Sequence, residues 1–529
     1  MDRITERERT LTRRRFLGVG GLTTAAVLLG TSTINSHQAL ANPSFLDDPF
    51  KLGVASGDPL PNGVVLWTRL APDPFDPSGG MPPEAFGVRY EVAEDPAFQR
   101  IRQRGTVEAM PELAHSVHAE VTGLLPGREY YYRFKAGPEI SPVGRTKTAP
   151  AVGESVSAFK FAFASCQMYE HGYFTAYRHM ASEDLDVVLH LGDSIYEHGP
   201  NQYRAASGNV RQHIGPEVSS LFDYRRRHAQ YRTDPDLQAA HAAFPWIVTL
   251  DDHEIDNNWA DEIPERNQSI EAFRQRRINA FQAYYEHMPL RSSAVPHGLD
   301  MQLYRRATFG DMVEFSVLDT RQYRDDQACG DGVDVDCADR LDPSRSIMGF
   351  EQERWLSDGL GRSNARWNVI AQQVVMAQFD HSSGPEQAFQ NDIWDGYKPS
   401  RDRLFTGLIE QNVRNPVVLT GDVHRNLAMD LKSDFDNPDS TTIGVEFAGT
   451  SISSGGDGQD TDASGLTFLA ANPHFKFNNT LRGYVRCSLT SSQGRTDYRV
   501  LPYVSQPGAP VSTRKSFIVE EGKPGLQDA

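Results

Sequence analysis

Leu185-Asp-Val-Val-Leu-His-Leu-Gly-Asp193-Ser-Ile-Tyr196 is the stretch that decides the fold of this chain. Its apolar run predicts a short buried strand, and the glycine predicts a turn that leaves Asp193 at the carboxyl end. Two later stretches repeat the arrangement, Trp246-Ile-Val-Thr-Leu-Asp251-Asp-His-Glu254 and Pro416-Val-Val-Leu-Thr-Gly-Asp422-Val-His424. Loops at strand ends converge in space while the strands hold them rigid. Three such donor clusters indicate a multinuclear metal site in a metal-dependent hydrolase.

The spacing inside the clusters suits two cations that share a ligand. Asp193 can bridge them, and the phenolate of Tyr196, three residues on, favours a hard trivalent ion. Asp422 and His424 are separated by one residue, so both point the same way from an extended segment. Taken singly, Asp193 or Asp422 would equally suit a turn cap. The order of three clusters, each after its own apolar strand, carries the prediction.

The chain has 529 residues, which exceeds one ordinary core and predicts at least two domains. Residues 46–145 contain short alternating segments separated by Gly, Pro and Asp, which favours a small antiparallel β-sandwich. Residues 138–157 are rich in Gly, Pro, Ser and Thr and are the expected linker. From 155 to 505, apolar runs alternate with helical stretches, which predicts a layered α/β domain. Residues 506–529 are expected to form a flexible C-terminal tail.

Residues 1–41 are interpreted as an export signal. Arg13-Arg14-Arg15-Phe16-Leu17 precedes the uncharged stretch 18–29, and Ala39-Leu40-Ala41 offers a cleavage site. A basic disordered tail would not require these features in this order. The paired arginines resemble a twin-arginine signal, so we expect the twin-arginine export machinery to carry the protein. It would then be secreted, or lie at the cell surface or in the periplasm.

The net charge and the cysteines indicate which partners and which ligands are expected. The formal net charge of −17 argues against nucleic acid as a specific partner and suits a protein that binds hard cations, although solubility alone would explain it equally well. Cys329 and Cys337 flank a short acidic loop, and a disulfide between them is expected in an oxidising compartment. Cys487 is expected in the core, whereas Cys166 follows a strand and is a candidate ligand.

With these motifs in place, the chain resembles the PhoD-type alkaline phosphatases of the metallophosphoesterase superfamily. Asp251-Asp-His-Glu254 stands where the superfamily has Gly-Asn-His-Glu, and Gly421-Asp-Val-His424 stands for Gly-His-x-His. Phe163-Ala-Ser-Cys166-Gln replaces Asp-x-His. These substitutions are features of the PhoD type, and further matching segments extend the resemblance over residues 46–500. The resemblance implies a four-layer αββα metallophosphoesterase domain preceded by the small antiparallel β-sandwich.

The resemblance also implies Fe3+ and Ca2+ as cofactors. Fewer histidines and more aspartates shift the preference from zinc toward calcium, and a thiolate with a phenolate suits ferric iron. The iron ligands would be Cys166, Asp193, Tyr196 and His424, and the calcium ligands would be Asp193, Asp252 and Asp422. A buried core cysteine remains the alternative for Cys166. Asp251, Glu254 and Asn257 compete with Asp252 for its role, and the region of Gln372 and Gln373 is an open candidate for a further ligand.

The implied activity is hydrolysis of phosphate mono- and diesters by water that the metals activate. His253 is the candidate proton donor to the leaving group, with a hydrogen bond that orients a ligand as the alternative. Arg321 and Arg425 are candidates to grip the phosphate, unless they form ordinary surface pairs. A phospholipase D-type phosphodiesterase acting on a lipid substrate and a 5'-nucleotidase-like phosphatase are the alternative functions. A non-enzymatic binding module would have scrambled metal ligands, which this chain does not.

Overall fold

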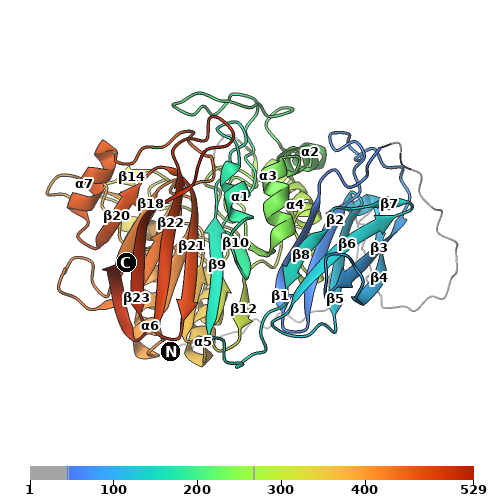
Figure 1. Cartoon of the computed structure of the whole chain (residues 1–529). Helices are drawn as coiled ribbons and strands as arrows, with labels where there is room; N and C mark the ends of the chain where they lie inside the picture. The colour runs from blue at the N-terminus through green and yellow to red at the C-terminus, as the bar shows by residue number, and fades with distance from the viewer. Residues whose placement is uncertain (1–44, 46, 266–267) are drawn as a thin grey trace, which may run out of the picture. The chain divides into compact units, whose positions relative to one another are not determined.

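The computed structural model describes residues 45, 47–265 and 268–529 (Figure 1). The predicted export signal, residues 1–41, lies outside the described residues. No helix within the described part of the chain is both long enough and apolar enough to span a bilayer.

The largest sheet has ten strands. Their order is β24 (Lys523–Asp528), β23 (Ser512–Glu520), β22 (Gln493–Leu501), β21 (Arg482–Thr490), β9 (Ala158–Ala164), β10 (Val187–His190), β11 (Pro245–Val248), β1 (Val54–Leu60), β2 (Gly63–Arg69) and β5 (Ser116–Thr122). In its centre, β9, β10, β11 and β1 run parallel. The carboxyl ends of β9, β10 and β11 therefore meet at one edge of the sheet.

A second sheet has seven strands. Their order is β12 (Arg305–Phe309), β13 (Val313–Val317), β15 (Trp367–Ala371), β17 (Pro416–Thr420), β19 (Thr442–Ala448), β18 (Asn426–Lys432) and β20 (Phe475–Asn479). Here β13, β15, β17 and β19 are parallel neighbours. A two-stranded ribbon, β14 (Val333–Asp334) with β16 (Phe389–Gln390), stands apart from both large sheets.

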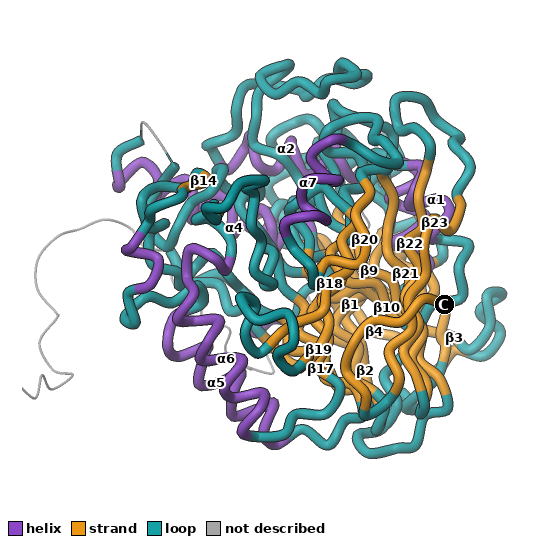
Figure 2. Tube along the Cα trace, turned by 90° about the vertical axis from the view of Figure 1, so that its left-hand side faces the viewer, coloured by secondary structure: helices purple, strands orange, loops and turns teal. Residues whose placement is uncertain are grey.

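Alternating side chains divide the core into layers. Along β9, Phe161 and Phe163 pack with Phe315 and Val369 of the seven-stranded sheet, whereas Ala162 and Ala164 turn toward helices. The helices on that side are α1 (Thr175–Met180), α2 (Leu221–Arg232), α3 (Pro235–Ala243) and α4 (Ile270–His287). The outer face of the second sheet packs on α5 (Gly349–Arg362) and α6 (Lys398–Glu410), which lie side by side (Figure 2). The predicted mixed α/β class is confirmed, with helices outside two facing sheets.

The N-terminal region forms an antiparallel sandwich, and one of its sheets continues into the ten-stranded sheet. The other sheet contains β4 (Ile101–Ala109), β3 (Phe86–Ala93), β6 (Glu129–Ala136), β7 (Glu139–Ile140) and β8 (Gly144–Lys147). It packs on β1, β2 and β5 through a shared apolar core that includes Val64, Leu66 and Phe134. Interpreting all of 138–157 as linker is wrong, because β7 and β8 both pair with β6.

The prediction of a flexible tail after residue 505 is wrong. β23 and β24 add two strands to the edge of the ten-stranded sheet, and Phe517 and Val519 are buried in its inner core. Phe517-Ile-Val519 alternates as a strand does, and this signal outweighs the Pro and Gly that precede it. The disulfide predicted between Cys329 and Cys337 is confirmed, and Cys487 is buried as expected. The remaining α-helix among the described residues, α7 (Ala463–Ala471), precedes β20.

Candidate metal centre

The three donor clusters lie at carboxyl ends of strands, and the structure brings them together. Cys166 follows β9, Asp193 follows β10 and Asp252 follows β11. Asp422 follows β17 in the other sheet. A parallel bridge between Ser165 and Ser451 ties the end of β9 to the segment after β19, so the ends of the two sheets meet.

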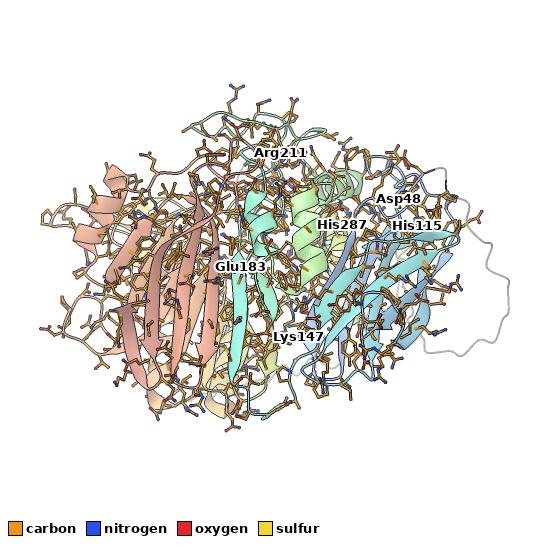
Figure 3. All side chains as sticks on the ribbon, in the orientation of Figure 1. Asp48, His115, Lys147, Glu183, Arg211 and His287 are labelled. Atoms are coloured by element: carbon orange, nitrogen blue, oxygen red, sulfur yellow. A yellow bond between two sulfur atoms is a disulfide. The ribbon has the colours of Figure 1, made fainter. Side chains whose placement is uncertain are left out.

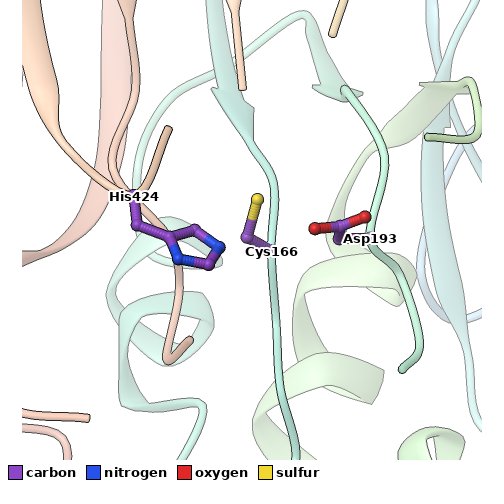
Figure 4. A group of neighbouring side chains, drawn as sticks. All are labelled: Cys166, Asp193 and His424. Carbon is purple, nitrogen blue, oxygen red and sulfur yellow. The ribbon is translucent and has the colours of Figure 1, made fainter. Parts of the chain in front are cut away.

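The first donor set contains Cys166, Asp193 and His424. One ligand atom from each lies within 4.8 Å of the others, and Figure 4 shows the three side chains facing a common point. Tyr196 joins this set, since its hydroxyl donates to Asp193 Oδ2 at 2.9 Å and lies 3.2 Å from His424 Nε2. Ser454 Oγ donates to the same phenol oxygen at 2.8 Å, which fixes the ring. All four predicted iron ligands are therefore neighbours.

The second donor set contains Asp251, Asp252 and Asp422, again with ligand atoms within 4.8 Å of one another. Asp193, Asp252 and His253 form a further set by the same measure, so Asp193 lies between the two larger sets. Among described residues, Asp251 Oδ2 and Asp252 Oδ1 are buried without a hydrogen-bond partner. Asp251 was predicted to compete with Asp252 for one ligand position, whereas the structure places both aspartates in the same donor set.

The backbone of the site is held in an uncommon conformation. Cys166, Asp193, Asp422 and His424 have φ of +59°, +57°, +56° and +53°, in the left-handed region that non-glycine residues rarely adopt. Such strain persists only where surrounding contacts enforce it, and it concentrates at functional sites. The four turns aim these side chains inward from two different sheets.

Gly192 is required for one of these turns. Its φ is +113°, and an added Cβ would lie 2.3 Å from Asp251 Cβ. We expect Gly192→Ala to destabilise the protein by about 3 kcal/mol or more, because it combines backbone strain with a clash. Gly153→Ala is the matched control, since Gly153 has φ +77° with nothing within 4 Å, and should cost about 1 kcal/mol. Equal losses in denaturant titrations would contradict the steric argument.

The site contains several buried acidic groups whose pKa values are raised. Burial and neighbouring carboxylates raise the pKa of Asp193 well above its ordinary value, and burial with the charge of Asp252 raises the pKa of Asp422 to about 7. Burial, Asp193 and Asp422 raise the pKa of the Cys166 thiol as well. So many buried acidic groups cannot ionise together without positive charge nearby. The donor set therefore fits bound metal ions.

His253 forms an ion pair that sequence reasoning missed. Its Nδ1 lies 2.8 Å from Glu197 Oε2, and its ring stacks on Tyr196 with centroids 4.2 Å apart. Burial would lower the pKa of His253, but Glu197, Asp252 and Asp193 outweigh burial and raise it well above the ordinary value. A protonated imidazole beside the metal site can donate a proton to a leaving group.

Three residues considered as possible metal ligands, Glu254, Gln372 and Gln373, form hydrogen bonds within the protein. The Glu254 carboxylate accepts from the backbone N–H groups of Asp193, Ser194 and Asp251, and so holds two site loops together. The Gln372 amide donates to Val374 O and Thr420 Oγ1, and the Gln373 amide donates to Thr249 Oγ1 and Leu318 O. Asn257, the other competitor, donates its backbone N–H to Glu197 Oε1.

Both arginines that were predicted to bind phosphate, Arg321 and Arg425, form ion pairs with aspartates. Arg321 is fully buried and donates to Asp251 at 2.6 Å and to Asp392 at 2.9 Å, while its Nη2 lies 3.6 Å from Asp252. It therefore holds two candidate ligands in position. Arg425 forms a two-pronged pair with Asp462, at 2.9 and 2.7 Å.

Comparison with known proteins agrees with this geometry. The PhoD-like phosphatase family matches residues 161–498, and the N-terminal domain of PhoD-like phosphatases matches residues 36–150. Alkaline phosphatase D of Bacillus subtilis (strain 168) is 53% identical over 522 residues, which are 98% of this chain and 89% of the relative. A solved structure of PhoD is 55% identical with a TM-score of 0.91, covering 92% of this chain and 93% of that one. Two matching domains in the same order, over almost the whole chain, establish that this protein belongs to the PhoD-like phosphatase family.

Proposed function

We propose that this protein is an exported alkaline phosphatase and phosphodiesterase that uses iron and calcium to hydrolyse phosphate esters. One observation carries the proposal: two donor sets of different chemistry lie at the meeting point of two sheets, and Asp193 of the first set is also grouped with Asp252 of the second. A phosphate ester carries negative oxygens that repel a nucleophile, and two neighbouring cations offset that repulsion.

The donor types support the choice of metals. A thiol, a phenol, an imidazole and a carboxylate surround one position, and such a set favours Fe3+. Carboxylates alone surround the other, and oxygen ligands favour Ca2+. We assign Cys166, Asp193, Tyr196 and His424 to iron and assign the second donor set to calcium, with Asp193 bridging. When bound, the two cations would lower the pKa of a water molecule and withdraw charge from the phosphate oxygens.

The side chains around the metals supply positioning and a proton. Glu197 holds Nδ1 of His253, which directs Nε2 away from Glu197 and leaves it free to protonate the departing alcohol oxygen. Arg321 holds Asp251 by a direct hydrogen bond and balances the charge of the aspartates, so we assign it to ligand positioning in place of phosphate binding. Arg425 keeps its assignment to phosphate binding only if Asp462 releases it.

Metal removal tests the function. The purified protein should hydrolyse 4-nitrophenyl phosphate and bis(4-nitrophenyl) phosphate, lose both activities in chelator, and regain them with Fe3+ and Ca2+ together. Restoration by zinc alone would contradict the assignment. The resemblance to alkaline phosphatase D does not favour the phospholipase D and nucleotidase alternatives. They predict a strong preference for phosphatidylcholine or for nucleoside monophosphates in the same assay.

Export is proposed from the sequence of residues 1–41. Replacing Arg13, Arg14 and Arg15 by lysine keeps the charge but removes the paired arginines. The variant should accumulate inside the cell with its first 41 residues attached, as judged by fractionation and mass measurement. Unchanged export would contradict the twin-arginine assignment.

A further inference from the structure

A small cavity adjoins the candidate metal centre. Gln167 and Ser194, the residues next to Cys166 and Asp193, line one side of it. Residues of β10, α2 and α3 line the other side, among them His190, His228, Arg232 and His241. The cavity leaves about 10 Å³ for the centre of a water-sized sphere, which is room for one small occupant.

Arg232 brings an uncompensated positive charge to this cavity. It is 3% exposed, and no ion pair joins it to a carboxylate in the part of the chain that the structure describes. Its Nη2 donates to the carbonyl of His287 at 2.7 Å, and its guanidinium lies over the ring of Trp67. Figure 3 labels His287 at the end of α4. Nη1 of Arg232 has no hydrogen-bond partner among the described residues.

Three histidines at the same cavity also have unpartnered nitrogens. His190 Nε2, His228 Nε2 and His241 Nδ1 are buried without a hydrogen bond to any described residue. The tautomer of His190 follows from its other nitrogen, because the backbone N–H of Gly192 donates to Nδ1 at 3.4 Å. The proton of the neutral ring therefore lies on Nε2, which is a buried donor without an acceptor.

Other polar groups lining the cavity are satisfied. The Gln167 amide donates to the carbonyl of Ser194 at 2.7 Å, and Ser194 Oγ donates to Glu254 at 2.7 Å. Among the residues that line the cavity, the buried nitrogens without a hydrogen-bond partner therefore belong to Arg232 and the three histidines. A buried cation destabilises the folded protein unless it is paired, and a buried donor without an acceptor adds to that destabilisation.

We propose that this cavity binds a single small anion of the halide class, chloride in ordinary solution, held by Arg232 Nη1 and the N–H of His190. The charge of the guanidinium favours an anion over a neutral water molecule. A polyatomic anion such as phosphate exceeds the available space. A metal ion does not suit the site, because no set of close metal-binding atoms among the described residues includes these histidines.

Anomalous diffraction tests the proposal directly on the metal-loaded protein. Crystals of the full chain grown with sodium bromide in place of sodium chloride should show a bromine anomalous peak in the cavity, within hydrogen-bonding reach of Arg232 Nη1. A cavity that holds a water molecule without anomalous signal, or nothing at all, would overturn the proposal. This experiment needs no variant, so it remains decisive if substitutions at Arg232 prevent folding.

A solution experiment gives an independent readout. Replacing sodium gluconate by sodium chloride at fixed ionic strength should raise the melting temperature saturably, by roughly 3 °C at saturation. Arg232→Met should abolish this chloride dependence. Arg69→Gln is the control, since Arg69 is also buried and its Nη2 also has no hydrogen-bond partner among the described residues, but it does not line the cavity. Loss of the dependence in the control alone, or its persistence in Arg232→Met, would contradict the site.

Discussion

An Asp193→Asn variant is expected to lose at least ~10³-fold in kcat/KM and to retain neither metal in full. The side chain lies between both donor sets, so removal of its charge weakens both cations at once. Metal stabilisation of a transition state is worth several kcal/mol, and about 4 kcal/mol corresponds to a thousandfold in rate. Asparagine is the suitable replacement because it keeps the size and tolerates φ near +57°.

Asp58→Asn is the matched control for this experiment. Asp58 also has a positive φ, at +43°, and its carboxylate is paired with Arg305 at 2.8 Å, but it lies in the N-terminal sandwich. Its replacement should leave kcat/KM within about twofold of the parent protein, a normal margin for a change outside the site. Full metal content and near-normal activity in Asp193→Asn would refute the bridging role.

A Glu197→Gln variant is expected to lose activity in proportion to how much the leaving group needs a proton. With an alkyl phosphate, kcat should fall about 10²-fold, since general acid catalysis is worth 10²–10⁴-fold. With 4-nitrophenyl phosphate the loss should stay below about tenfold, because nitrophenolate departs without a proton. Rate measurements with both substrates supply the comparison.

The Glu197→Gln experiment also needs the His253→Ala variant and the double variant. If Glu197 acts through His253, the double variant should be no slower than His253→Ala alone, since residues in direct contact are not additive. A merely structural role for Glu197 predicts equal losses on both substrates. That outcome would remove His253 from its assignment as proton donor.

The sequence predicts the strand-end donors well for a physical reason. Asp193, Asp252 and Asp422 each follow an apolar run whose direction and burial fix where the chain emerges. Parallel pairing brings the ends of β10 and β11 together, and the bridge between Ser165 and Ser451 joins this edge to the second sheet, which contains β17. The mixed α/β class follows from the same alternation of runs and helical stretches.

Pairings across long sequence distances were not predictable in this way. Glu197 meets His253 56 residues later, and Arg321 meets Asp392 71 residues later. No local pattern marks such partners, so the sequence does not indicate Glu197, and it offers Arg321 only as a candidate for phosphate binding or for a surface ion pair. The strands after residue 505 were missed because their alternation is short and follows a Pro-rich turn.

Iron and calcium content with a visible spectrum tests the central claim most directly. The protein as purified after export should contain both metals and show a charge-transfer band from the phenolate of Tyr196 and the thiolate of Cys166. Tyr196→Phe and Cys166→Ser should each shift or abolish the band and lower phosphodiester hydrolysis. Zinc or no bound metal in the parent protein, with hydrolysis unchanged in both variants, would contradict the assignment of these residues to a metal centre.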